Sequence, residues 1–404
     1  MRQLLYYEWK KILGRRANQV AILLGFLLVV ICNVAQIQGE TLNDNGKEWR
    51  GIEAILRQQE IENALTDELD EEFLTDFLRE YQRQIVGNPS GYDYSLIQPK
   101  SNLFALIAKN YVEWNEYFDY ETLSRIPTED GIGFYDRRME KIETLLNAEY
   151  SYGNYTEAER QYWLEKAGAV STPFQWGGKD VWDIIWTGIG MLFYQFLVVG
   201  LCIAPVFAGE CQNRTDALLL TTKYGKNKAI FAKLLVSFAF SFLYITLCGL
   251  ISVGINMALL GTKGWNLPLQ LWDTLFPYEW TVAQACIINL CVMILIALLL
   301  TAFSLMLSAI SRSPVIVLAV DVLLFFGTAF LPFSKSSGLW NKIVRLVPMN
   351  CCSLKNVLKS YNDYPFGNLI ISYLGMIFLV YIFLTLICTL CAGKGFRRYR
   401  GSDN

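Results

Sequence analysis

The sequence predicts an all-α polytopic membrane protein with six transmembrane helices and a mostly helical extracytoplasmic domain inserted between the first and second helix. Six stretches of 20 or more residues carry at most one charged side chain each. A helix needs about 20 apolar residues to cross the hydrocarbon layer, where its backbone polar groups can pair only within the helix. The segment between the first two stretches, residues 38–183, is long enough to form one compact domain.

The first apolar stretch lies between Arg16 and Glu40 and predicts a span at 17–37. Its uncharged core is longer than the apolar region of a secretory signal peptide. Asn33 and Gln36 stand where small residues would mark a cleavage site. We therefore expect this helix to be retained as a membrane span.

Five further spans are predicted after the outer domain. Four lie in stretches without a charged side chain, and one contains a single acid, Asp321. The predicted spans are 184–208, 234–260, 282–310, 314–333 and 369–392.

Basic side chains predict that both termini are cytoplasmic in a multi-pass protein of the cell membrane, because short basic loops resist translocation. Lys and Arg cluster before the first span, in the loop at 209–233 and in the tail at 393–404. Residues 38–183, 261–281 and 334–368 are then outside, although the last of these also carries five basic side chains. Seven tryptophans are expected at the outer interface, where an amphipathic ring is stabilised. They are Trp176, Trp182, Trp186, Trp265, Trp272, Trp280 and Trp340.

The outer segment is strongly acidic. Residues 38–180 hold 28 acidic and 14 basic side chains, a net charge near −14. A nucleic-acid partner would need a basic soluble face, so this class of function is disfavoured. Apolar residues at every fourth position predict an amphipathic helix that starts near Thr66. They are Leu65, Leu69, Phe73, Phe77, Tyr81 and Ile85. Thr156 and Glu159 match the capping box of another helix.

The composition excludes several kinds of catalytic and metal-binding site. The chain has no histidine, which excludes Ser-His-Asp and Cys-His nucleophiles, the His-Glu-x-x-His zinc helix and ordinary zinc or haem ligation. No cysteine lies in 38–180, so no disulfide staples the outer domain, a pattern compatible with a bacterial envelope. The Gly-Lys pairs at 178, 225 and 393 lack the other residues of a phosphate-binding Walker A loop. We expect no catalytic site, metal or cofactor in this chain, which favours a transporter or channel.

The loop after the second predicted span carries the most specific pattern. Glu210 closes that span, leucines and threonines follow, a basic turn comes next, and Lys233 opens the third span. The residues that form this pattern are Glu210, Arg214, Leu218, Leu219, Leu220, Thr221, Thr222, Lys226 and Lys233. In this order they resemble the permease subunits of the ABC-2 family of ATP-binding cassette transporters. Residues 1–16 are similar to the interfacial elbow helix of that family, and residues 331–348 to its outer re-entrant helices.

The resemblance implies the membrane half of an exporter. A second permease, identical or related, and cytoplasmic ABC ATPase subunits would be its partners besides membrane lipid, and ATP and Mg²⁺ would be bound by the ATPase. The implied docking site is the loop at 209–233. The leucines at 218–220 would offer an apolar ridge to a groove, while Arg214 and Lys226 would fix its orientation. The alternative to a docking site is a loop that only stops translocation, in which case its basic residues serve the membrane topology alone. Peptides, lipids and drug-like molecules are the implied substrates.

Asp321 supports a different hypothesis. It lies eight residues past Ser313, about 12 Å into the membrane at about 1.5 Å per residue. A charge there costs about 2.5 kcal/mol or more, so it should face a cavity or a partner. Contact with a substrate or proton would favour an ion-coupled secondary transporter, and a hydrogen bond to a neighbouring helix would be purely structural. A third hypothesis is a membrane sensor with a ligand-binding outer domain, for which the cytoplasmic stretch at 209–233 is short.

Overall fold

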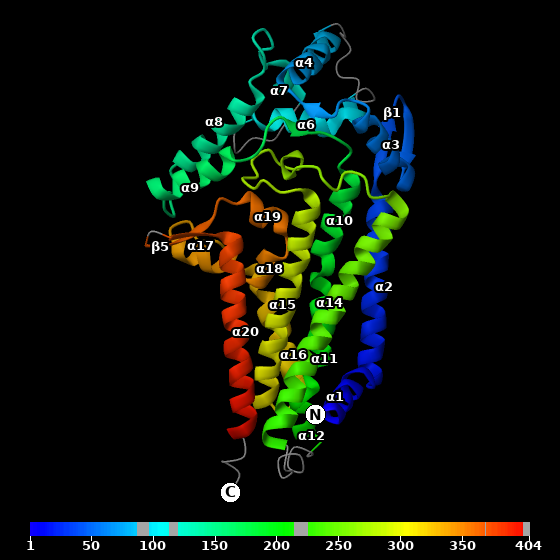
Figure 1. Cartoon of the computed structure of the whole chain (residues 1–404), viewed down its shortest axis with the longest axis vertical. Helices are drawn as coiled ribbons and strands as arrows, with labels where there is room; N and C mark the ends of the chain where they lie inside the picture. Colours follow the sequence, from blue (N-terminus) through cyan, green and yellow to red (C-terminus); the bar gives the residue numbers. More distant parts are fainter. Residues whose placement is uncertain (87–96, 113–119, 214–224, 368, 399–404) are drawn as a thin grey trace.

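The computed structural model consists of a long helical bundle with a smaller helical domain at one end (Figure 1). It describes residues 1–86, 97–112, 120–213, 225–367 and 369–398. Within these ranges, five helices are long and apolar enough to cross a membrane. They span Arg16–Gly39, Asp180–Gln212, Asn227–Leu260, Val282–Ile310 and Tyr373–Phe396. The prediction of a mainly helical chain with several membrane-spanning helices is confirmed.

Four of these crossings are single helices, and the crossing at Asp180–Gln212 is segmented. The single ones are α2 (Arg16–Gly39), α14 (Ile230–Leu260), α15 (Val282–Ile310) and α20 (Tyr373–Arg398). The segments of the other are α10 (Asp180–Gly190), the 3-10 turn η2 (Met191–Tyr194), α11 (Gln195–Ile203) and α12 (Pro205–Gln212). Pro205 lacks a backbone N–H, which breaks the helix there. The Ser308 hydroxyl on α15 stabilises the break, because it accepts from the N–H groups of Phe207 and Ala208 at 3.0 and 2.8 Å.

The predicted span at 314–333 is shorter than expected. Its helix, α16 (Pro314–Phe325), has 12 residues, which is about 18 Å of helix against a hydrocarbon layer of about 30 Å. The 3-10 turn η5 (Gly327–Phe330) follows, and the backbone is extended at Leu331. The last predicted span also differs at its start, because residues 369–372 form a strand and the helix begins at Tyr373. The fifth predicted span, 314–333, is thus a helix too short to cross alone.

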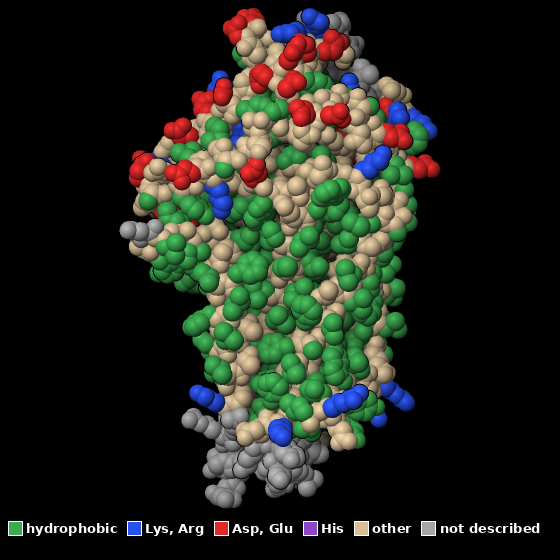
Figure 2. All heavy atoms as spheres, in the orientation of Figure 1, with side chains coloured by type: hydrophobic (Ala, Val, Ile, Leu, Met, Phe, Trp, Pro, Cys, Tyr) green, Lys and Arg blue, Asp and Glu red, His purple; other side chains and the backbone are tan. Residues whose placement is uncertain are grey.

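The surface of the bundle carries the distribution expected of a protein surrounded by lipid. Figure 2 shows hydrophobic side chains over the bundle, Lys and Arg without Asp or Glu at one end, and Asp and Glu together with some Lys and Arg over the domain at the other. Helix α1 (Arg2–Leu13) lies at the basic end (Figure 1). We call the two ends the α1 end and the domain end. Leu23 on α2 and Leu390 on α20 are among the large apolar side chains that stay exposed on the bundle.

Helix α15 holds the centre of the bundle, in contact with α10, α11, α12, α14, α16 and α20. Polar contacts tie α2 to its neighbours. Asn33 on α2 accepts from Ser252 and Asn256 of α14 at 2.9 and 2.6 Å. Farther along α2, the amide of Gln195 donates to the Gly25 carbonyl and accepts from the Tyr244 hydroxyl. A Cβ at Gly25 would stand 2.0 Å from that hydroxyl, so this crossing requires glycine.

The domain at the domain end combines helices with two small antiparallel sheets, whereas the sequence predicts a mostly helical domain. Its helices are α3 (Ile52–Asn63), α4 (Glu71–Val86), the 3-10 helix η1 (Gln98–Lys100), α6 (Ser101–Lys109), α7 (Tyr120–Ser124), α8 (Phe134–Asn147) and α9 (Glu157–Gly168). Its sheets pair β1 (Thr41–Asp44) with β2 (Lys47–Arg50), and β3 (Glu68–Leu69) with β4 (Phe174–Gln175). Asn45 and Gly46 both have positive φ, which suits the two-residue turn between β1 and β2.

The predicted start of the amphipathic helix near Thr66 is wrong. Leu69 belongs to strand β3, and α4 begins at Glu71 because the Asp70 carboxylate accepts from the Phe73 N–H at 2.7 Å. The fully buried side of α4 carries Leu74 and Leu78 and not the predicted Phe73 and Phe77, which are partly buried. The prediction is thus wrong by one residue at Phe73 and Phe77, whereas Tyr81 is buried as predicted. The capping box of α9, formed by Thr156 and Glu159, is confirmed.

The domain is fixed to the bundle through the loop between α14 and α15. Arg138 on α8 is 2% exposed and donates to the carbonyls of Thr274, Phe276 and Ala167. Three of the tryptophans predicted for an interfacial belt instead pack in this junction, with 1–5% exposure. They are Trp176, Trp182 and Trp186. The expectation of an interfacial ring is wrong for these three, because the domain covers the helix ends where they lie.

The segment between α16 and α20 forms a lateral protrusion beneath the domain (Figure 1). It contains three short helices and a hairpin, where only helices were predicted. The helices are α17 (Gly338–Arg345), α18 (Pro348–Cys351) and α19 (Leu354–Lys359). The hairpin pairs β5 (Asp363–Phe366) with β6 (Leu369–Ser372), in the register Asp363 to Ser372.

Candidate functional site at the α1 end

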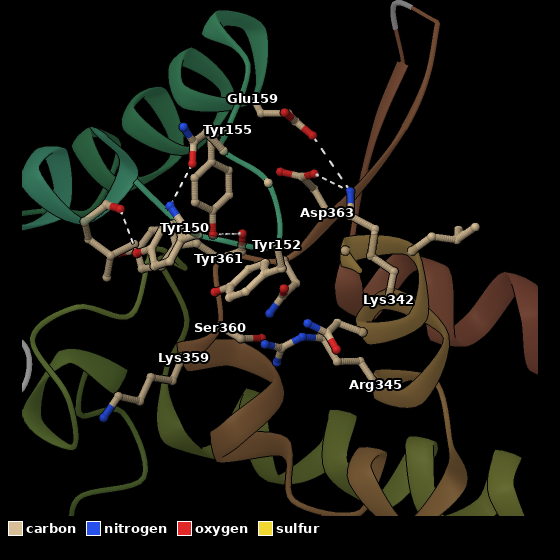
Figure 3. A pocket seen from close by; sticks show the side chains of 17 residues that line it. Tyr150, Tyr152, Tyr155, Glu159, Lys342, Arg345, Lys359, Ser360, Tyr361 and Asp363 are labelled. Atoms are coloured by element: carbon tan, nitrogen blue, oxygen red, sulfur yellow. Dashed lines mark hydrogen bonds and ion pairs between the residues drawn. The ribbon is translucent and has the colours of Figure 1, made fainter. Parts of the chain in front are cut away.

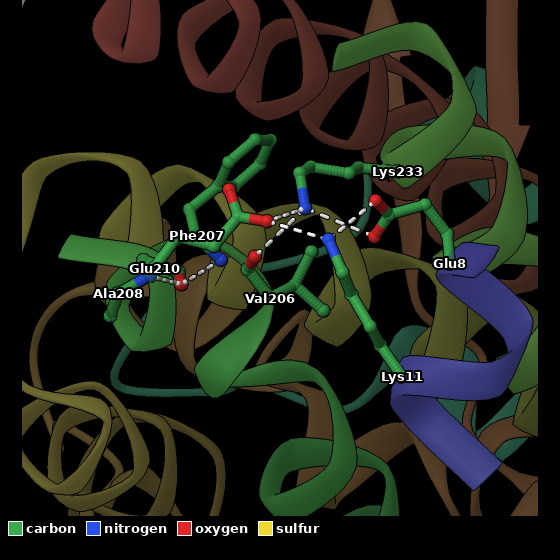
Figure 4. A network of polar contacts seen from close by, with 8 residues as sticks. Glu8, Lys11, Val206, Phe207, Ala208, Glu210 and Lys233 are labelled. Atoms are coloured by element: carbon green, nitrogen blue, oxygen red, sulfur yellow. Dashed lines mark hydrogen bonds and ion pairs between the residues drawn. The ribbon is translucent and has the colours of Figure 1, made fainter. Parts of the chain in front are cut away.

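Four charged side chains from three helices meet inside the α1 end of the bundle (Figure 4). Glu8 and Lys11 come from α1, Glu210 comes from α12, and Lys233 comes from α14. The Lys233 ammonium lies 2.6 Å from a Glu210 oxygen and 3.0 Å from a Glu8 oxygen. Lys11 bridges the same two carboxylates at 2.8 and 2.9 Å. The two acids and two bases form one neutral cluster, which we call the α1 ion network.

Burial differs between the two lysines of the network. The side chain of Lys233 is fully buried, whereas that of Lys11 is 45% exposed. The third donor position of Lys233 reaches the Val206 carbonyl at 3.4 Å, and its ammonium also lies 5.8 Å from the centre of the Phe207 ring. A buried ammonium needs such complete pairing, because an uncompensated charge in a low-dielectric interior is strongly destabilising.

The electrostatics keep the exposed lysine charged. Burial lowers the pKa of Lys11, but its bonds to Glu210 and Glu8 outweigh that effect and raise the pKa above its ordinary value. Protonated Lys11 therefore persists over the whole physiological pH range. Together with Lys233 it fixes α1 to the ends of the two helices that flank residues 213–229.

The structure places only part of the predicted docking site. Glu210 is described and belongs to the α1 ion network. Lys226 falls in the π-helical turn η3 (Gly225–Ala229), and its side chain lies outside the described residues. The remaining predicted residues lie in the undescribed range 214–224. They are Arg214, Leu218, Leu219, Leu220, Thr221 and Thr222.

Asp321 lies in α16 and is 2% exposed. Neither of its carboxyl oxygens has a hydrogen-bond partner within the part of the chain that the structure describes. The Ser304 hydroxyl of α15 is the polar group within electrostatic reach. On the side of α11, a Cβ built at Gly200 would come 3.7 Å from the Asp321 carboxylate, so the acid packs close to this helix. Asp321 is thus buried between three helices of the bundle.

The sequence pattern did not reveal that Glu8, Lys11 and Lys233 form one cluster with Glu210. The sequence does contain a signal for such a cluster, because each of these charged residues lies at the margin of a predicted span or in the segment before the first span. Which acid meets which base depends on how three helices converge, and that information is absent from a single sequence.

All four side chains of the α1 ion network are engaged in ion pairs with one another. The described residues hold no group of three or more His, Cys, Asp or Glu side chains suited to bind a metal. Neither a protein-family model nor a curated protein matches this sequence.

Proposed function

We propose that this chain is the membrane-spanning permease subunit of an ATP-driven exporter of the ABC-2 type, and that a separate cytoplasmic ATPase docks on residues 209–233. The observation that supports this most directly is the α1 ion network. It joins the surface helix α1 to α12 and α14, the two helices between which the loop lies. A force applied to the loop would reach two spans and the surface helix as one unit.

In this proposal the chain has no catalytic residue of its own. ATP and Mg²⁺ are bound by the ATPase, and both termini of the permease are cytoplasmic in a cell-membrane complex with a second permease. The substrate is a peptide, a lipid or a drug-like molecule. The exposed apolar surface of the bundle and the basic residues at the α1 end support this orientation (Figure 2).

The test is purification of the tagged full chain from its native membrane in a mild detergent, followed by identification of bound proteins and an ATP hydrolysis assay. The proposal predicts a co-purifying ATPase with Walker motifs. Glu210→Gln and Lys233→Met together should weaken that association, because they release the loop from the α1 ion network. Purification of the intact chain without any ATPase would contradict the proposal.

An ion-coupled transporter is the second candidate, and Asp321 favours it. An acid that is 2% exposed and has no hydrogen-bond partner in the described chain is costly unless it binds a proton or cation during a transport cycle. Reconstituted vesicles distinguish the two functions. Uptake driven by an ion gradient without ATP, and lost in Asp321→Asn, would favour this candidate over the permease.

A further inference from the structure

A cavity of about 450 Å³ lies where the domain meets the lateral protrusion (Figure 3). Its walls come from the connection between α8 and α9, from α17 and from the residues between α19 and β5. Tyr150, Tyr152 and Tyr155 line one side, and Lys342 and Arg345 line the other. The cavity is far from the α1 end and shares no residue with the α1 ion network.

The cations of this cavity differ in how they are paired. Lys342 lies 3.9 Å from Glu159 and 3.7 Å from Asp363, and Lys359 lies 3.0 Å from Asp273. These carboxylates compensate both lysines.

Arg345 has no such partner. Among the described residues, its guanidinium makes no ion pair or hydrogen bond, and it lies 5.2 Å from the centre of the Phe333 ring. Arg345 is therefore the cation of the cavity that remains available to an external anion. A guanidinium offers a planar fork of donors that matches two oxygens of a phosphate or carboxylate.

Aromatic side chains form the wall opposite Arg345. The rings of Tyr150 and Tyr152 stack with centroids 5.3 Å apart. The Tyr150 hydroxyl donates to the Leu145 carbonyl, and the Tyr155 hydroxyl donates to the Tyr361 carbonyl, so both rings are held in place. In the described chain the Tyr152 hydroxyl has no hydrogen-bond partner, which leaves it free to donate to a ligand.

Apolar surface continues from the cavity along α17. Leu339 lines the cavity and is 73% exposed, and Ile343 on the same face of the helix is 53% exposed. Figure 2 shows hydrophobic side chains on the protrusion where Figure 1 places α17 and β5. A molecule with an anionic head in the cavity could place an apolar chain on this face, at the border between the bundle and the domain.

We infer that this cavity binds the phosphate headgroup of a membrane amphiphile, with Arg345 and the Tyr152 hydroxyl as donors to the phosphate and the Leu339 face as the seat of the chain. Burial of apolar surface and a charge-assisted hydrogen bond then contribute to affinity together. This inference is independent of any ATPase at the α1 end, so the two proposals fail or hold separately.

The experiment uses the purified full chain in dodecyl maltoside and native mass spectrometry to measure binding of three probes. Lysophosphatidylglycerol carries one phosphate and one chain, glycerophosphoglycerol has the same headgroup without the chain, and lysophosphatidylcholine has the chain with a zwitterionic head. We expect lysophosphatidylglycerol to bind most tightly. Arg345→Gln should weaken it by about tenfold or more, since a hydrogen bond to a charged group is lost.

Matched variants keep the test falsifiable. Arg137→Gln removes an exposed arginine that pairs with Glu140 outside the cavity, and it should leave binding unchanged. If Arg345→Gln is poorly folded, Tyr152→Ala provides a second variant, because its ring is 39% exposed. Equal binding by the wild type and both cavity variants would overturn the inference. Binding of glycerophosphoglycerol as tight as that of lysophosphatidylglycerol would also overturn it, since the site would then take free anions.

Discussion

Removal of the buried ammonium from the α1 ion network should be strongly destabilising. In Lys233→Met, Glu8 and Glu210 keep only Lys11, whose side chain is 45% exposed. Breaking a buried ion pair by removing one partner costs about 3–5 kcal/mol. We expect about 3 kcal/mol, the lower end of that range, because Lys11 still contacts both carboxylates. The matched variant Lys11→Met removes the exposed lysine and should cost about 0–1 kcal/mol.

The assay is unfolding in mixed dodecyl maltoside and dodecyl sulfate micelles, followed by tryptophan fluorescence, with the free energy of unfolding compared between variants. Adding Glu8→Gln to Lys233→Met removes one of the two carboxylates that then share Lys11, and this should recover most of the stability. The reasoning is refuted if Lys233→Met is no less stable than Lys11→Met, or if the added Glu8→Gln lowers stability further.

Three further predictions concern the other sites. Replacing the leucines at 218–220 with Asp should abolish ATPase co-purification while membrane insertion stays intact, and retained binding would exclude this ridge as the docking surface. Asp321→Asn should leave ATP-dependent transport near the wild-type rate, and a complete loss in reconstituted vesicles would contradict the permease proposal. Burial raises the pKa of Asp363 to about 7, while Glu159 and Lys342 face it from α9 and α17. Asp363 therefore gains a proton as the pH falls from 8 to 6, which removes a negative charge from the cavity. Lysophosphatidylglycerol should bind several-fold more tightly at pH 6, and Asp363→Asn should bind it equally at both pH values.

The long helices could be predicted because charged residues mark where they leave the membrane. The helix Val282–Ile310 begins and ends at the residues expected from the uncharged stretch, and its capping residue Thr281 fixes the start. The segment after Pro314 is as apolar as the others, yet its helix ends at Phe325. Hydropathy reports only that a segment avoids water, so it cannot distinguish a full crossing from a short helix with an extended end.

Tertiary packing explains the remaining differences. Trp186 was expected at a lipid interface because it lies near the end of a span, but the domain covers that end and buries the ring. The sequence predicts Lys233 at the start of a span, but its partner Glu8 lies 225 residues away on α1, and its partner Glu210 lies across the loop on α12. Arg345 is one of the five basic side chains in the predicted outer segment 334–368. Its place in a cavity depends on how α17 packs beside the residues that connect α8 and α9.

The central position of α15 provides a reference frame for measuring motion. A helix that touches six neighbours cannot shift without disturbing most of the bundle, so distances are best measured from it. The chain already carries an exposed thiol on α15, Cys291, and another on α20, Cys391. Cys32 and Cys211 are partly accessible and would be replaced, so that spin labels attach only to Cys291 and Cys391. The distance between the two labels would then report whether α20 separates from α15 when nucleotide or ligand is added.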